Sequence, residues 1–147
     1  MKRILFLTVY ASPYRVRFFD ELGKSIQVTV LYSRPCEDAH HRDAKWFESG
    51  HGNFHEVQLK SLCTIGGKQL CPEVCKWLKK PYDAIVICGY SSPTAILAMR
   101  WLRRRKIPFY MEVDGGLIRQ ERKVKYLFKK SLVRKADQWL SSGRYTT

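Results

Sequence analysis

The chain lacks the features that identify several common classes of protein. No apolar run approaches the roughly 20 residues that a membrane-spanning helix needs. Lys2 and Arg3 precede the apolar run Ile4 to Val9, as at the start of a signal peptide, but that run is short and no small-residue cleavage site follows it. The five cysteines are odd in number and irregularly spaced, so they indicate no disulfide framework. These absences favour a cytoplasmic protein with reduced thiols.

Motifs for cofactors and metals are also missing. The chain contains neither GxGxxG nor a P-loop lysine motif, which excludes the commonest dinucleotide and nucleotide fingerprints. Cys71 and Cys75 would share one face of an expected helix, but no second pair completes a zinc site. The histidines near Cys36 do not have the spacing of a standard metal site. We therefore expect no bound metal and no cofactor.

Acidic residues are scarce relative to basic ones. The 147 residues include 27 Lys and Arg but only 13 Asp and Glu, which gives a net charge of +14. Such a balance favours an anionic partner: nucleic acid, acidic lipid or a phosphorylated small molecule. The hydrophobic fraction of 45% is sufficient for a folded core, and the length is that of one domain.

Apolar strand patterns alternate with helical patterns along the chain. This alternation predicts an α/β domain with a doubly wound, Rossmann-like and mostly parallel sheet. Residues 33–53 are expected to form a long loop with one short helix around Trp46. The expected strands are 3–9, 26–32, 54–59, 84–88, 108–113 and 137–141, and the expected helices are 12–23, 70–80, 92–106 and 118–135.

In such a sheet, ligands bind outside the carboxyl ends of the strands. After the first strand come Ser12, Tyr14 and Arg15, at the start of a helix whose free N–H groups and arginine can hold an anion or a sugar hydroxyl. The alternative is a simple capped helix, with Arg15 and Arg17 in solvent.

A second candidate segment follows the strand at 84–88. It contains Gly89, Tyr90 and Ser91, where a glycine lets a ligand approach the backbone and the hydroxyl groups offer polar contacts. An ordinary turn between a strand and a helix would have the same composition.

A third candidate segment contains Glu112, Asp114, Gly115 and Gly116. One of the two carboxylates that flank Val113 is expected to face the cleft. We expect Asp114, at the tip of the strand, to be that residue, with the two glycines leaving room for its partner. The alternative is that Asp114 only forms a turn or an N-cap.

Half of the net charge lies in residues 115–135, which contain eight basic residues and one acidic residue. Helical spacing places Val124, Leu127, Phe128 and Leu132 on one face and most of the basic residues opposite. This pattern fits a helix on an anionic membrane surface, and it equally fits a core helix with a solvated basic back. The candidate membrane-surface residues are Arg122, Lys123, Lys125, Lys129 and Lys130.

Taken in order, these segments resemble the N-terminal domain of GT-B-type retaining glycosyltransferases of family 4. The resemblance rests on Ile4 to Leu7 with Ser12 to Val16, on Gly89 to Pro93, on Glu112 to Gly116, and on Ala136 to Gly143. It implies two Rossmann-like domains that face a cleft. The N-terminal domain would bind the acceptor, and a C-terminal domain would hold the nucleotide-sugar.

The resemblance also implies roles for parts of this chain. Asp114 matches a polar residue that contacts the donor sugar, which makes it the catalytic candidate. No metal or other cofactor is implied, and the nucleotide-sugar is a substrate of the full-length enzyme. The expected partners are a glycan or lipid-linked acceptor, an anionic membrane surface and the protein's own C-terminal domain, whereas nucleic acid is not expected.

The chain departs from this family in two respects. Ala11, Ser12 and Pro13 stand where many members have a Gly-rich loop, so phosphate contact through this loop is not expected. The sequence ends at Thr147 without a donor domain, so the fragment alone should be inactive. The alternative function is a standalone, basic, flavodoxin-like module that binds anionic membrane or nucleic acid.

Overall fold

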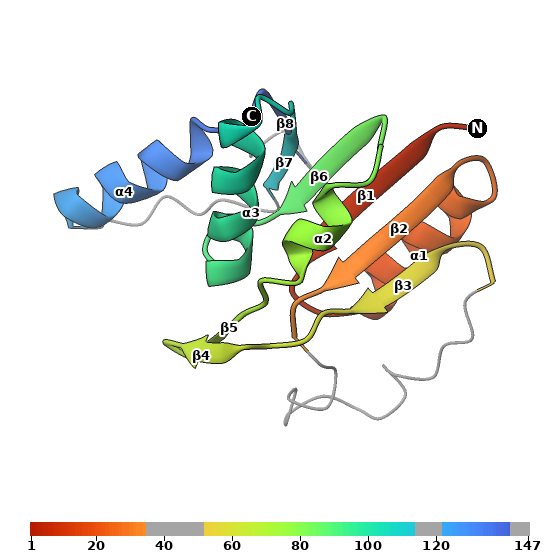
Figure 1. The fold of residues 1–147 in the computed structure, drawn as a ribbon, viewed down its shortest axis with the longest axis horizontal. Helices are drawn as coiled ribbons and strands as arrows, with labels where there is room; N and C mark the ends of the chain where they lie inside the picture. Colours follow the sequence, from red (N-terminus) through yellow and green to blue (C-terminus); the bar gives the residue numbers. More distant parts are fainter. Residues whose placement is uncertain (35–51, 114–121, 142–147) are drawn as a thin grey trace.

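The computed structural model describes residues 1–34, 52–113 and 122–141. Eight strands and four helices lie within these ranges (Figure 1). In chain order they are β1 (Arg3–Thr8), α1 (Pro13–Gly23), β2 (Gln27–Tyr32), β3 (His55–Gln58), β4 (Cys63–Ile65), β5 (Lys68–Leu70), α2 (Val74–Leu78), β6 (Ala84–Cys88), α3 (Pro93–Arg104), β7 (Tyr110–Val113), α4 (Lys123–Val133) and β8 (Gln138–Ser141).

Six strands form one sheet in the order β3-β2-β1-β6-β7-β8, and every neighbouring pair is parallel. Counted among the strands of this sheet alone, that is the 3-2-1-4-5-6 order of a Rossmann fold. The strand order reverses between β1 and β6. The predicted α/β class with a doubly wound parallel sheet is therefore confirmed.

Each face of the sheet has its own core. Alternate residues of β1 point to opposite faces, so Phe6 packs with Phe19 of α1, whereas Leu5 and Leu7 pack with α3 and α2. The strands are nearly continuous apolar runs because both faces are covered, as parallel sheets require.

A close contact between two backbone segments explains the glycine at the end of α1. Gly23 is helical and has no positive φ, so a left-handed C-cap does not explain it. A Cβ at this position would collide with the carbonyl oxygen of Asn53, which precedes β3. Close approach of these two segments therefore excludes any larger residue.

The segment between β3 and β6 differs from its prediction. Residues 70–80 were expected to form one helix, but α2 begins only at Val74. Before it, β4 and β5 pair as an antiparallel hairpin, whose turn contains Gly66 and Gly67 with positive φ. Thr94 of α3 fixes this hairpin: its Oγ1 donates to the Gln69 carbonyl at 2.7 Å and accepts from the Cys71 N–H at 3.0 Å. Cys71 is thereby held ahead of the helix, and it does not share a helical face with Cys75. The predicted helix around Trp46 lies outside the described residues.

Candidate functional site

A hollow of about 350 Å³ opens at the carboxyl ends of β1, β6 and β7. This is the edge of the sheet where the strand order reverses, and α1 and α3 begin there on opposite faces. Its volume suits a small ligand. The predicted cleft residues that line it are Ser12, Tyr14, Arg15, Gly89, Tyr90, Ser91 and Glu112.

An ion pair crosses the floor of this hollow. The Arg15 guanidinium donates from both terminal nitrogens to the Glu112 carboxylate, with Nη2 at 2.6 Å from Oε2 and Nη1 bonded to Oε1. Nη2 also donates to Sγ of Cys88 at 2.9 Å. The guanidinium lies over the Phe19 ring, with Cζ 5.0 Å from the ring centroid. Arg15 is only 8% exposed, so the pair joins α1, β6 and β7 beneath the surface.

The environment fixes the charge state of these groups. Burial by itself would lower the pKa of Arg15. The hydrogen bonds to Glu112 and the electrostatic interactions with Cys88 and Glu112 together outweigh this effect and raise that pKa, so the guanidinium stays charged. Burial raises the pKa of the Cys88 thiol, and the nearby Arg15 charge offsets this only in part. Cys88 is therefore a neutral thiol at physiological pH.

The charges of the described side chains that line the hollow balance each other. Arg15 and Glu112 are the charged side chains among the described residues that line it, and they neutralise each other. Arg15 is thus not a solvated surface residue. Its charge is also already paired, so it does not form a free binding site for an anion such as phosphate. Glu112 is the carboxylate that faces the hollow, and its oxygens have lone pairs beyond those used by Arg15. Asp114, Gly115 and Gly116 lie outside the described residues.

The turn after β6 is built around one glycine and one cap. Gly89 has φ of 91°, a conformation that other residues adopt at a cost, and this explains its place beside the hollow. Ser92 caps α3 by accepting a hydrogen bond from the Ala95 N–H at 3.1 Å. Ser12 occupies the same position ahead of α1, but its side chain makes no capping hydrogen bond, although the residue is 4% exposed. Tyr14, in contrast, is largely exposed.

Sequence reasoning missed Lys68 as a neighbour of this site. Its Nζ reaches from β5 and donates to Oγ of Ser91 at 2.8 Å and to the Ser91 carbonyl at 3.1 Å. Because the hairpin itself was not predicted, no sequence signal placed Lys68 there. Cys88 was likewise read only as a structural thiol.

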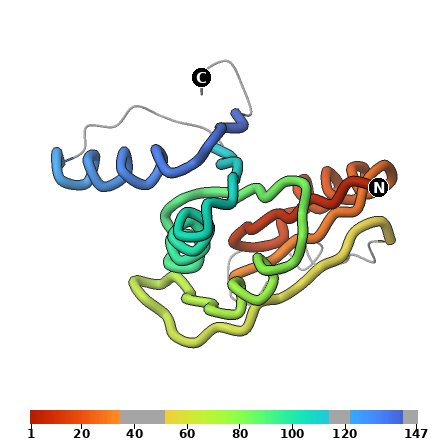
Figure 2. Tube along the Cα trace, turned by 45° about the horizontal axis from the view of Figure 1, so that its top comes forward, coloured from red at the N-terminus to blue at the C-terminus, as the bar shows by residue number. Residues whose placement is uncertain are grey.

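The predicted membrane-surface helix is present as α4, beside α3 at the opposite end of the molecule from the N-terminus (Figure 2). Only one residue of its expected apolar face is buried. Leu132 packs into the core, but Val124, Leu127 and Phe128 are 80%, 61% and 57% exposed. The core-helix interpretation is therefore wrong for these three residues, because the first turns of α4 lead away from the sheet. Arg122, Lys123, Lys125 and Lys130 are exposed, and Lys129 is half-buried.

Within the described ranges, no three His, Cys, Asp or Glu side chains lie close enough to hold a metal ion. Cys63, Cys71, Cys75 and Cys88 are free thiols. No helix in the described part of the chain is both long and apolar enough to cross a bilayer.

Neither the protein-family models nor the curated proteins include a match to this chain. Several solved structures match this chain. UGT89C1 of Arabidopsis thaliana, complexed with UDP, superposes with a TM-score of 0.56 at 14% identity, over 97% of this chain and 45% of that one. A UGT transferase from Siraitia grosvenorii, also with UDP, gives a TM-score of 0.48 at 12% identity, over 79% and 28% of the two chains. The chain thus spans about half the length of UGT89C1, and the likeness shows a shared Rossmann-like fold.

Proposed function

We propose that this chain is the N-terminal, acceptor-binding domain of a glycosyltransferase that moves a sugar from a nucleotide-sugar to a glycan or lipid-linked acceptor. The observation that carries the proposal is the neutral hollow at the carboxyl edge. A site for the donor phosphates needs uncompensated positive charge, but here Arg15 is neutralised by Glu112. A sugar acceptor is uncharged and rich in hydroxyl groups, which matches what the hollow offers.

Each part of the hollow has a role in this proposal. The remaining lone pairs of Glu112 accept hydrogen bonds from acceptor hydroxyl groups, and Ser12 and Ser91 add polar contacts. Tyr14 and Tyr90 present aromatic rings with polar tips, which suit the mixed surface of a sugar. Arg15 orients the Glu112 carboxylate, while Gly89 shapes the wall.

The shared fold with UGT89C1 supports the glycosyltransferase class. The finer assignment, to a retaining enzyme of family 4, rests on the sequence resemblance. In this assignment a separate C-terminal domain supplies the donor site, and Asp114, next along the chain from Val113 at the hollow, contacts the donor sugar as the catalytic residue. Gly115 and Gly116 leave room for that sugar, and no metal or cofactor takes part.

The proposal also places the enzyme in the cytoplasm, at the inner face of a membrane. The feature that supports a membrane location is α4, in which exposed Val124, Leu127 and Phe128 lie opposite a face rich in lysine and arginine. A helix of this kind lies in the interface of an anionic bilayer, with its apolar side chains inserted and its basic ones near the headgroups. Membrane binding through α4 would bring a lipid-linked acceptor close to the domain that contains the hollow.

The same helix favours a second candidate function, a module that binds anionic membranes without catalysis. The two candidates differ in what the complete open reading frame encodes. For a transferase, the protein made from that reading frame turns over a nucleotide-sugar, whereas residues 1–147 alone do not. Asp114→Asn lowers this turnover sharply without lowering the melting temperature, and Glu21→Gln, on the exposed side of α1, changes neither. Absence of turnover from the complete product, combined with vesicle binding, would leave the membrane module as the function.

A further inference from the structure

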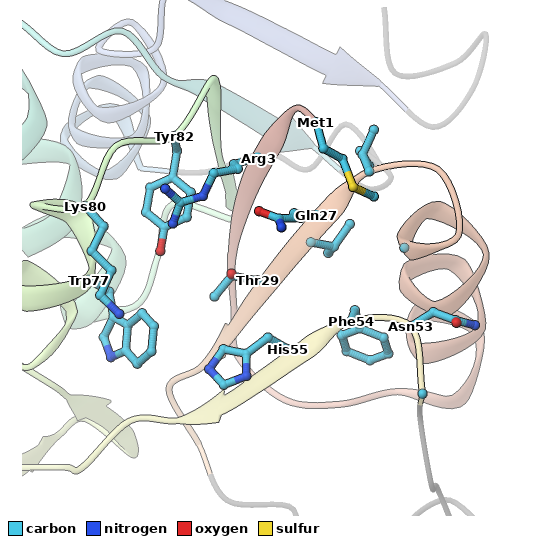
Figure 3. A pocket seen from close by; sticks show the side chains of 14 residues that line it. Met1, Arg3, Gln27, Thr29, Asn53, Phe54, His55, Trp77, Lys80 and Tyr82 are labelled. Atoms are coloured by element: carbon cyan, nitrogen blue, oxygen red, sulfur yellow. The ribbon is translucent and has the colours of Figure 1, made fainter.

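A second, larger hollow of about 520 Å³ lies at the opposite edge of the sheet, where β1, β2 and β3 begin (Figure 3). None of the predicted site residues lines it. Its polar side chains project on the face of the sheet that carries α2 and α3, and Trp77, Lys80 and Tyr82 form a wall there. The hollow also extends around the strand starts to the α1 side, where Gly23, Val28 and Phe54 line it.

The alternation of β1 and β2 explains why this hollow exists. Leu5, Leu7 and Leu31 fill the α2 side of the sheet toward its carboxyl end. One pleat earlier on the same face stand Arg3 and Thr29, which are polar. Since α2 has only five residues, it covers the apolar half and leaves this polar half open.

The sheet register brings four polar side chains together on the floor. Arg3 pairs with Gln27 across β1 and β2, and Thr29 pairs with His55 across β2 and β3. These partners lie side by side on one face, because paired residues of neighbouring strands project in the same direction. They offer a guanidinium, an amide, a hydroxyl group and an imidazole to a common space.

Two aromatic side chains hold the cations of the wall in place. The Arg3 guanidinium lies over the Tyr82 ring, with Cζ 5.4 Å from the centroid, and the Tyr82 hydroxyl group is hydrogen-bonded to Thr29. Lys80 Nζ lies 3.6 Å from the centroid of the Trp77 ring. Figure 3 shows these four side chains gathered on one side of the hollow. Stacking on aromatic rings limits the motion of both cations, which reduces the entropy lost when an anion binds.

The charge here contrasts with the neutral hollow at the carboxyl edge. Of the described residues that line this hollow, none is an aspartate or glutamate, whereas Arg3, Lys80 and the amino group of Met1 are cationic. Asp83 follows the lining residue Tyr82 in the sequence, but it does not line the hollow. Its carboxylate accepts a hydrogen bond from the backbone N–H of Arg3 at 2.7 Å.

We propose that this hollow is a second ligand site, which binds a phosphate monoester of a hydroxylated small molecule such as a sugar phosphate. Arg3 and Lys80 hold the phosphate, as expected from the fork of the guanidinium and the point charge of the ammonium. Gln27, Thr29 and His55 hydrogen-bond the hydroxyl groups of the ligand. This site is independent of the acceptor assignment at the other edge of the sheet.

The test is a titration of the 15N-labelled chain with glucose 6-phosphate, followed by two-dimensional NMR. The proposal predicts saturable shifts at the amides of Arg3, Gln27, Thr29 and His55, with glucose much weaker and inorganic phosphate intermediate. Arg3→Gln and Lys80→Gln should each weaken binding about tenfold, the effect of losing one charge-assisted contact. Lys80 is exposed, so its variant stays folded even if the Arg3 variant does not.

The matched control is Lys76→Gln, which removes one exposed charge from α2, shortly before Lys80 in the chain, at a position that does not line the hollow. Its affinity should equal that of the unmodified chain. Equal weakening by Lys76→Gln would mean general attraction to a basic protein and would overturn the proposal. Shifts confined to other amides would also overturn it. So would Arg3-dependent binding to vesicles that contain phosphatidic acid without binding of glucose 6-phosphate, because the phosphate would then come from a lipid headgroup.

Discussion

Arg15 and Glu112 are separated by 97 residues in the sequence and meet in a two-pronged ion pair at the carboxyl edge of the sheet. The pair lies where the strand order reverses, and it links the first turn of α1 to the end of β7. It makes the adjoining hollow neutral and leaves part of Glu112 available to a ligand. The functional assignment depends on this single contact.

The ion pair should contribute measurably to stability. Arg15→Gln or Glu112→Gln leaves the other member of a half-buried pair without its charged partner, which should lower the free energy of unfolding by about 2 kcal/mol. Urea denaturation of both single variants and the double variant measures this coupling. Arg17→Gln, on the exposed side of α1, is the control and should leave stability nearly unchanged. Additive effects of the two single changes would show that the pair is not formed.

The thiol of Cys88 should be unreactive. Because burial raises its pKa, a smaller fraction is thiolate at pH 8 than for an ordinary cysteine, and only the thiolate reacts. Exposed Cys63 serves as the internal comparison. Alkylation with iodoacetamide, followed by mass spectrometry of peptides, should label Cys63 well before Cys88. Labelling at equal rates in the folded protein would contradict the described environment of Cys88.

Ser92, which precedes α3, should contribute more to the stability of the fold than Ser12, which precedes α1. Ser92→Ala removes a side-chain cap from α3 and should cost about 1 kcal/mol. Ser12→Ala removes no capping hydrogen bond and should cost less. Thermal denaturation of the two variants makes the comparison. A larger loss for Ser12→Ala would indicate that its hydroxyl group has a role other than capping.

The exposed face of α4 should determine membrane binding. Replacing Leu127 and Phe128 by serine removes two side chains from the inserting face and should weaken binding to anionic vesicles at least about tenfold. The melting temperature should not fall, because neither side chain is in the core. Leu62→Ser, at an equally exposed position of the hairpin, should bind like the unmodified chain. Vesicle sedimentation at several salt concentrations checks both, and unchanged binding by the α4 variant would argue against the membrane assignment.

The parallel sheet could be predicted from the sequence because the patterns that indicate its strands and helices lie within short segments of the chain. The buried strands are continuous apolar runs, and Ser12-Pro13 and Ser92-Pro93 mark the starts of α1 and α3. Register and topology then bring the first two predicted segments, and Glu112 of the third, to one edge without further information.

What the sequence could not predict depends on contacts between distant residues. The pairing of Arg15 with Glu112 requires the sheet order, and the β4–β5 hairpin is held by Thr94, more than twenty residues further along the chain. The apolar spacing of α4 was equally consistent with a buried face and with an exposed one. Periodicity identifies an apolar face, but it does not tell whether that face packs on the core or on another surface. The second hollow arises from the shortness of α2, which a helical pattern over residues 70–80 concealed.

The most direct test of the central claim is whether the neutral hollow binds a sugar. The 15N-labelled chain is titrated with maltose and with octyl β-glucoside below its micelle concentration, and amide shifts are followed by NMR. We expect shifts at the amides of Tyr10, Gly89, Ser91 and Glu112, which are weakened in Glu112→Gln but preserved in Glu21→Gln. If neither sugar shifts these amides, or if Glu112→Gln binds as well as the unmodified chain, this edge of the sheet is not the acceptor site.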